Sequence, residues 1–162
     1  MAACSGPPEV QRDPAPLLQT SALTYTFERH DFGYSTTIPY TYRNETDADV
    51  ILDHCDGDVR PLLQIRRGDR WVDQWHPFMD GCSSPPLSIA PGDEYADTLR
   101  VIGAPPGSNV TPAFVFEDVE GVYRLYWFQA RLSDSDSVVP GEESGAAELP
   151  WRVSNAFVLQ LP

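Results

Sequence analysis

The chain has 162 residues, enough for one domain, and 41% of them are hydrophobic, so a buried core can form. Its 24 acidic residues outnumber 11 basic residues, all arginine, and the net charge of −13 argues against binding to the phosphate backbone of nucleic acids. The 16 prolines are spread along the chain, and no window shows a clean helical period of apolar residues. We therefore predict an all-β domain with many turns.

Residues 1–20 are polar and rich in proline and are predicted to be a flexible tether, which leaves residues 21–162 as the folded domain. At the start of the tether, Ala2 and Ala3 precede Cys4. This segment resembles the end of a bacterial lipoprotein signal peptide, in which small residues precede the cysteine that receives a lipid. The apolar segment that comes before such a cysteine is missing, so we expect a gene start placed too late or a trimmed N-terminus. The alternative is a chance Ala-Ala-Cys sequence in a cytosolic protein.

If Cys4 carries the lipid, Cys55 and Cys82 remain as a pair. In an oxidising cell envelope they are expected to form one disulfide, which would close a loop of about 28 residues and stabilise the domain by roughly 3–4 kcal/mol. The alternative is two free buried cysteines. No Cys-x-x-Cys pair is present, so neither a zinc site nor a thioredoxin-type redox site is indicated. We expect no metal and no cofactor.

Alternating apolar and polar residues predict strands from about residue 23 onward. In the first half of the domain, Pro39 lies inside one of these strands and indicates an edge position or a bulge. Gly68 lies in Arg67-Gly68-Asp69 and is suited to the turn of a hairpin. The strands expected in this half cover residues 23–27, 38–42, 62–66 and 70–75, and a short apolar run covers residues 50–52.

In the second half, the most apolar predicted strand covers residues 122–131 and turns Tyr123, Leu125 and Trp127 to one face. The other expected strands cover residues 87–89, 95–101, 114–116 and 153–161. Eight or nine strands with this spacing are typical of an antiparallel β-sandwich. Residues 133–150 are expected to form a long loop.

Gly121 and Tyr123 follow a run of acidic residues and look like the start of strand F in an immunoglobulin-like domain. In that family the tyrosine forms a corner, in which its hydroxyl bonds to the backbone upstream. Leu125 stands where antibody domains have a cysteine, so the inter-sheet disulfide of that family is not expected. The chain resembles small bacterial immunoglobulin-like lipoproteins of unassigned function, on short segments such as Trp71-Val72-Asp73 and residues 152–157. Its outline is also similar to a bacterial proteinase-inhibitor β-sandwich family.

The predicted long loop carries acidic side chains that we interpret as a partner-binding surface, namely Asp134, Asp136, Glu142 and Glu143. A second acidic cluster, Asp53, Asp56 and Asp58, surrounds Gly57 and has Ca²⁺ binding as its less favoured interpretation. No motif around the three histidines indicates catalysis.

We therefore expect a non-enzymatic envelope protein in the bacterial periplasm or at the cell surface, attached to a membrane by its N-terminal lipid. It would act as a protein-interaction or structural module and could serve as an accessory subunit of a larger membrane complex. One alternative is a proteinase inhibitor that uses the proline-rich loop 103–112. Another is a glycan- or Ca²⁺-binding module, in which Trp71, Trp75, Phe78 and Trp127 would form the platform for a sugar.

Overall fold

The computed structural model describes residues 17–78, 84–133 and 150–162. Within these ranges the chain forms twelve β-strands, one short 3-10 turn and no α-helix, which confirms the predicted all-β class. No helix in the described ranges has the length and apolarity that a membrane crossing requires. Several of the predicted functional residues lie outside the described ranges: Cys4, Cys82, Asp134, Asp136, Glu142 and Glu143.

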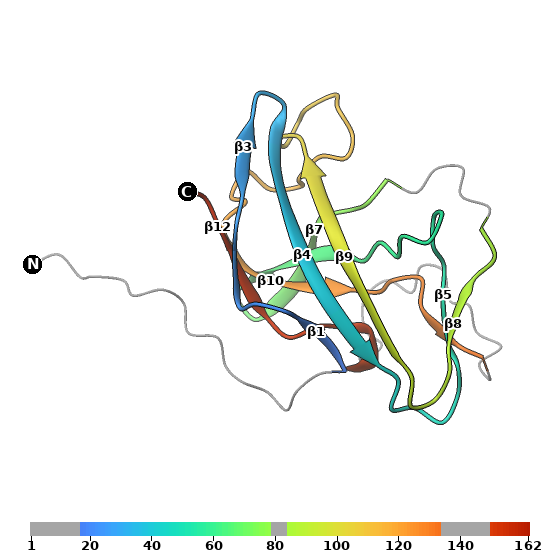
Figure 1. The fold of residues 1–162 in the computed structure, drawn as a ribbon. Helices are drawn as coiled ribbons and strands as arrows, with labels where there is room; N and C mark the ends of the chain where they lie inside the picture. The colour runs from blue at the N-terminus through green and yellow to red at the C-terminus, as the bar shows by residue number, and fades with distance from the viewer. Residues whose placement is uncertain (1–16, 79–83, 134–149) are drawn as a thin grey trace, which may run out of the picture.

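The first sheet is built around a long antiparallel pair, β4 and β9, which lie side by side across the front of the molecule (Figure 1). Ten residue pairs join these two strands, from Tyr34 opposite Gly103 to Arg43 opposite Glu94. On its other side β4 pairs with two short strands, one near each end. The strands of this sheet are β1 (Leu18–Thr20), β3 (Glu28–His30), β4 (Gly33–Arg43) and β9 (Glu94–Gly103).

The second sheet packs behind the first, and its strands run across the direction of β4 (Figure 1). The β6–β7 hairpin turns at Gly68, whose φ of +62° is readily adopted by glycine, as the sequence predicts. In strand order, this sheet consists of β2 (Thr24–Thr26), β12 (Phe157–Gln160), β10 (Gly121–Tyr126), β6 (Leu62–Arg67) and β7 (Arg70–Trp75).

A third, small sheet lies beside the two main sheets. Its central strand pairs Val50 with Ile89 on one side and with Leu132 on the other. The sheet consists of β11 (Arg131–Leu132), β5 (Val50–Leu52) and β8 (Leu87–Ile89), and the short 3-10 turn η1 (Pro150–Arg152) precedes the last strand, β12.

The first predicted strand differs from the observed structure. Instead of one strand at residues 23–27, the chain forms β1, β2 and β3 in turn, and these alternate between the two main sheets. Phe27 lies between β2 and β3 and is fully buried, which anchors the crossing between the layers. β1 itself pairs with β4 and lies within the segment expected to be tether, so residues 18–20 belong to the sheet.

Pro39 lies inside β4, which is a central strand, so the prediction of an edge strand or bulge is wrong. The missing N–H of proline is tolerated because neither β1 nor β3 pairs with β4 at Pro39. β1 pairs with Tyr40–Tyr42, and β3 pairs with Gly33–Ser35. The carbonyl oxygen of Pro39 accepts a hydrogen bond from Ser21 N, 2.9 Å away, just past the end of β1.

Two further predicted strands are changed by tertiary packing. Residues 114–116 form no strand, because Phe114 instead turns its ring into the core at 2% exposure, against Phe27 and Tyr34. The predicted strand at residues 122–131 ends at Tyr126. After a turn the chain continues as β11 in the third sheet.

The core lies between the two main sheets and is rich in aromatic rings. Tyr123, Leu125 and Trp127 are all buried on one face, as the alternation predicts. Trp127 contacts the rings of Tyr40 and Tyr42, with centroids 6.3 and 4.7 Å away, and so joins the end of β10 to β4. Burial raises the pKa of the Tyr42 phenol to about 12, so this ring stays neutral.

Tyr123 makes the contact expected of a tyrosine corner. Its hydroxyl donates a hydrogen bond to the Val119 carbonyl oxygen, 2.7 Å away and four residues upstream. Gly121, with φ of +154°, starts β10, and a Cβ at this position would lie 3.2 Å from the Ile65 side chain. The corner thus fixes the loop before β10 to the strand at the centre of the second sheet.

Replacing Tyr123 with phenylalanine keeps the ring and removes this hydrogen bond. Because the Val119 carbonyl is left without its donor in a buried site, we expect Tyr123→Phe to lower the free energy of unfolding by about 1–3 kcal/mol in urea titrations. Tyr34→Phe is the matched control, since no described residue bonds to the Tyr34 hydroxyl, and it should change stability by less than about 0.5 kcal/mol. Equal effects of the two variants would contradict the corner's role.

Candidate functional site

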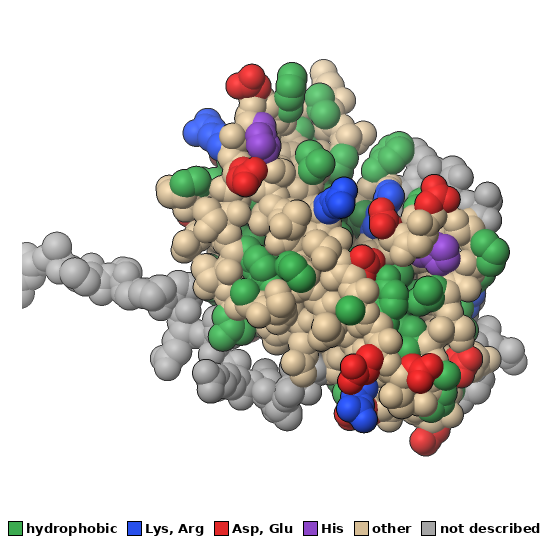
Figure 2. Space-filling model, in the orientation of Figure 1, with side chains coloured by type: hydrophobic (Ala, Val, Ile, Leu, Met, Phe, Trp, Pro, Cys, Tyr) green, Lys and Arg blue, Asp and Glu red, His purple; other side chains and the backbone are tan. Residues whose placement is uncertain are grey.

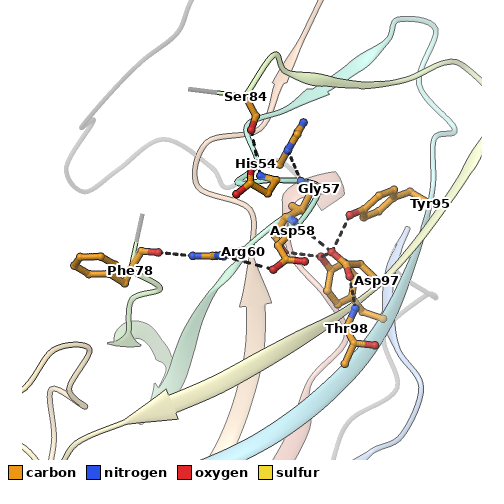
Figure 3. A network of polar contacts seen from close by, with 12 residues as sticks. His54, Gly57, Asp58, Arg60, Phe78, Ser84, Tyr95, Asp97 and Thr98 are labelled. Atoms are coloured by element: carbon orange, nitrogen blue, oxygen red, sulfur yellow. Dashed lines mark hydrogen bonds and ion pairs between the residues drawn. The ribbon is translucent and has the colours of Figure 1, made fainter. Parts of the chain in front are cut away.

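A tight turn at residues 55–58 is held by several hydrogen bonds (Figure 3). Cys55 N donates to Asp58 O at 3.1 Å, and Asp58 N donates back to Cys55 O at 2.9 Å. Gly57 N also donates to Nδ1 of His54, 2.9 Å away. The His54 ring nitrogen is thus used to hold the turn.

The turn leads into Val59, which is held to the first sheet by the Asp97 carboxylate (Figure 3). Asp97 Oδ2 accepts hydrogen bonds from the Tyr95 hydroxyl at 2.8 Å and from Val59 N at 3.3 Å. The Tyr40 hydroxyl donates to Val59 O at 3.1 Å and lies 3.4 Å from the same carboxylate. Burial and the nearby carboxylate both raise the pKa of Tyr95 and Tyr40, so both phenols remain donors at neutral pH.

Phe78 and Ser84, which flank residues 79–83, are both bonded to residues of this loop (Figure 3). On one side, Arg60 Nη1 donates to Phe78 O at 2.7 Å. On the other side, Asp56 N donates to Ser84 Oγ at 3.1 Å. Ser84, two residues after Cys82, is therefore held beside Asp56, the neighbour of the buried Cys55.

The Ca²⁺ alternative gains no support from this loop. Asp53 binds Arg131 at 3.2 Å and Asp58 binds Arg60 at 3.6 Å, so the two carboxylates have separate cationic partners. In the described ranges, no three histidine, cysteine or acidic side chains come together as metal ligands would.

The sugar-platform alternative is contradicted by the burial of its rings. Trp75 and Trp127 are only 3% and 2% exposed, and Trp75 Nε1 donates to Ile102 O inside the sandwich. Trp71 lies on the outer face of the second sheet, where the Arg124 guanidinium stacks over it at 4.6 Å. Only Phe78 among the four is strongly exposed, so these residues do not form one aromatic surface.

A chain of polar contacts that the sequence did not reveal crosses the outer face of the second sheet. His76 Nε2 lies 3.3 Å from Asp73 Oδ2, and Asp73 Oδ1 accepts from the Gln64 amide at 2.9 Å. Gln64 in turn accepts from Arg124 Nε at 2.8 Å. The hydrogen bond between the first pair raises the pKa of His76 and lowers the pKa of Asp73, while partial burial opposes both shifts.

A serine and a histidine also meet at the base of the β3–β4 turn. His30 Nε2 lies 2.6 Å from Ser35 Oγ and 3.9 Å from Glu28. In a catalytic triad the carboxylate binds the other ring nitrogen, so that Nε2 can take the serine proton. Here both partners face one nitrogen on an exposed hairpin, and the arrangement does not match that geometry.

Exposed apolar side chains gather at one end of the sandwich. Figure 2 shows them at the top of the molecule, over the β3–β4 turn and the segment that follows β9. Phe32 at the turn is 81% exposed and Ile102 is 65% exposed, and together with Tyr34 they line an open groove of about 620 Å³. We call this region the apolar end, and its exposed members are Phe32, Ile102, Val110, Val115 and Phe116.

The apolar end and the N-terminal segment lie at opposite ends of β4 (Figure 1). The β3–β4 turn precedes Gly33, whereas Leu18 enters the sheet opposite Tyr42. Nine residue steps of about 3.3 Å separate these two positions, a distance of roughly 30 Å.

The loop after β9 is closed at its base. Ala104 N donates to Pro112 O at 2.9 Å, and Phe114 N donates to Ala104 O at 3.0 Å. Val110 projects from this loop and is 54% exposed. The apolar periodicity of the sequence did not show that this loop belongs to the apolar end. The loop lies near Phe32 only because β9 pairs with β4.

No family model, curated protein or solved structure matches the chain.

The His76–Asp73 pair predicts a pH-dependent contribution to stability. Because the pKa of His76 is raised in the folded protein, its pairing with Asp73 stabilises the fold fully below about pH 6.5. This stabilisation is lost as the pH rises through the folded-state pKa of His76. Because the pKa of Asp73 is lowered in the folded protein, the stabilisation from its carboxylate is lost only in acid, as the pH falls below about 4. We expect His76→Gln to destabilise the protein more at pH 5.5 than at pH 8.5 in urea titrations, by less than about 1 kcal/mol because both side chains are solvated.

A double-mutant cycle provides the control. In an Asp73→Asn background, which keeps an acceptor for Gln64, the pH dependence of the His76→Gln effect should disappear. A pH dependence that survives in this background would show that another group is responsible.

Proposed function

We propose that the chain is a non-enzymatic, lipid-anchored envelope protein whose β-sandwich acts as a protein-interaction module. In this proposal the protein is an accessory subunit of a larger membrane complex in the periplasm or at the cell surface. The observation that carries the proposal is the apolar end, because Phe32 and Ile102 are strongly exposed and line one open groove, and exposed apolar side chains gathered in this way are typical of an interaction surface.

The position of the apolar end agrees with an anchor at Cys4. The N-terminal segment enters the sheet at Leu18, at the end of β4 that is far from Phe32. A lipid attached upstream of Leu18 would leave the apolar end free to face a partner. The acidic residues of the 133–150 loop remain a second predicted contact surface.

The disulfide between Cys55 and Cys82 is part of the same proposal. Cys55 is 8% exposed, and Ser84, two residues after Cys82, accepts a hydrogen bond from Asp56. Two residues span at most about 7 Å, which is compatible with the Cα separation of a disulfide. The bridge would fasten the 79–83 segment to the Asp97-bound loop.

The inhibitor alternative has one observation in its favour. The loop after β9 is exposed at Val110 and closed at its base by Ala104 and Pro112, and a constrained exposed loop is what a protease cleft accepts. This alternative predicts that the partner is itself a protease, which the following experiment can detect.

The apolar end is tested by capture from native membranes. Protein with a C-terminal affinity tag is extracted in mild detergent, and the proteins captured with it are identified and quantified. We expect a stoichiometric membrane complex with the unaltered protein and at least a ten-fold loss of it with Phe32→Ser combined with Val110→Ser. Both side chains are exposed, so the fold should be retained.

Leu23→Ser is the matched control, since Leu23 is 49% exposed and lies outside the apolar end. It should retain the complex. Recovery of the protein alone, or equal recovery with both variants, would overturn the proposed role. Capture of a protease that the purified domain inhibits would favour the inhibitor alternative.

The anchor at Cys4 is tested by intact mass. Protein extracted from its native membrane should carry acyl chains on an N-terminal Cys4, and Cys4→Ala should release the protein into the soluble fraction. An N-terminal Met1 without lipid would contradict the anchor.

The disulfide is tested by peptide mapping without reduction. Native envelope material should yield one linked peptide pair containing Cys55 and Cys82. Reduction should lower the free energy of unfolding by roughly 3–4 kcal/mol in the loop-entropy model. Two thiols that alkylate readily in the native protein would contradict this pairing.

A further inference from the structure

β9 is an open edge of the first sheet. It pairs with β4 at ten positions and with no other strand in the described ranges, and Figure 1 shows β4 on one side of it only. No proline or bulge interrupts the strand between Glu94 and Ile102. Natural edge strands are usually shortened, kinked or covered, so a long regular edge is a potential site for strand addition.

The register shows which peptide groups of β9 face outward. Pro39 lies opposite Thr98, and its carbonyl accepts a hydrogen bond from Ser21 on the far side of β4. At this pair the peptide groups of the two strands therefore point away from each other. Because the pattern alternates, the N–H and C=O groups of Ala96 and Arg100 also point away from β4.

Among the described residues, one outward N–H group and one outward C=O group are already occupied. Ile102 O accepts a hydrogen bond from Trp75 Nε1 at 3.0 Å. Thr98 N donates to its neighbour Asp97 Oδ1 at 2.7 Å. The N–H and C=O groups of Ala96 and Arg100 have no hydrogen-bond partner among the described residues. Two residues of the edge thus offer both a donor and an acceptor to an added strand.

The side chains along this edge define what such a strand would carry. Arg100 is exposed, and no acidic residue in the described ranges forms an ion pair with it, although the chain has a net charge of −13. Ile102, two positions further on the same face, is 65% exposed. An added strand would therefore be complementary if it placed an acidic residue opposite Arg100 and an apolar residue opposite Ile102.

We propose that β9 binds an extended segment of a partner protein by antiparallel strand addition, with an apolar residue opposite Ile102 and an acidic residue opposite Arg100. In the partner, the apolar residue comes first and the acidic residue follows two positions later, because the strands are antiparallel. Backbone hydrogen bonds to Ala96 and Arg100 supply affinity, and the two side chains supply specificity. The inference rests on the proposed interaction function and names the class of partner segment.

The probe for the test is the nine-residue peptide Ser-Thr-Ile-Thr-Asp-Thr-Thr-Thr-Ser, labelled with fluorescein for anisotropy and unlabelled for amide shift mapping. We expect saturable binding to the full chain, with the amides of Ala96, Thr98 and Arg100 shifted. Ala96→Pro removes an outward N–H without touching the ladder to β4, and should weaken binding at least ten-fold. Arg100→Glu should do the same, and a probe with lysine in place of aspartate should prefer this variant.

Arg29→Glu is the matched charge control, since Arg29 is another exposed arginine without a described ion pair, and it should leave binding unchanged. The urea midpoints of all variants show that they are folded. Absence of saturable binding up to about 1 mM probe would overturn the proposal, as would equal affinity in the β9 variants. It would also be overturned if Ala96→Pro changed only the self-association of the protein.

The two proposals can fail separately. Phe32→Ser with Val110→Ser should leave probe binding intact, because neither residue belongs to β9. Loss of the captured complex in that variant with normal probe binding would support the apolar end alone. Probe binding without any captured complex would support the β9 edge and overturn the proposed subunit role.

Discussion

The structure depends on the packing of Trp127 against tyrosines of the opposite sheet. Trp127 follows β10, and its ring meets Tyr40 and Tyr42 from β4 and Tyr95 from β9, with centroids between 4.7 and 6.4 Å apart. Aromatic pairs of this kind contribute about 0.5–1.5 kcal/mol each beyond the area they bury. Because the strands of the two main sheets cross, this cluster is one of the places where side chains of both layers meet, and it holds β4 and β9 over the second sheet.

The Asp97 network extends this contact to the loop between β5 and β6. The hydroxyls of Tyr40 and Tyr95 reach past the aromatic cluster to Asp97 and Val59, and the loop they hold carries Cys55. Each phenol thus contributes its ring to the core and its hydroxyl to loop placement. A disulfide to Cys82 would add a covalent link at the point where the hydrogen bonds already converge.

The length of β4 separates the N-terminal segment from the exposed Phe32. One end of this strand receives the N-terminal segment and the other carries the exposed Phe32, roughly 30 Å away. Between these ends, β9 presents an edge with which no other strand in the described ranges pairs, and its Arg100 forms no ion pair with a described residue. In the proposed function, specificity would come from the placement of a few exposed side chains at the far end and along this edge.

Much of the fold was predictable from local pattern. The alternation around Tyr123 predicted the buried face of β10, and Gly68 predicted the β6–β7 turn, because both signals depend only on neighbouring residues. Local pattern failed at residues 18–30, which change sheets twice, and at Phe114, whose ring enters the core from a segment without a strand. The prediction from Pro39 was wrong because β1 and β3 pair with β4 on either side of this proline and leave it without a strand partner there. That arrangement depends on pairing between segments far apart in the sequence.

By itself, the sequence determined the all-β class, the acidic character and the three cysteines, since composition and period-2 alternation act through nearest neighbours. Only the tertiary structure decided which apolar residues stay exposed. It placed Phe32 beside Ile102 and left one side of β9 without a strand partner in the described ranges. The reason is physical: whether an apolar side chain or a peptide group meets water depends on what packs against it, and those partners lie far away in the sequence.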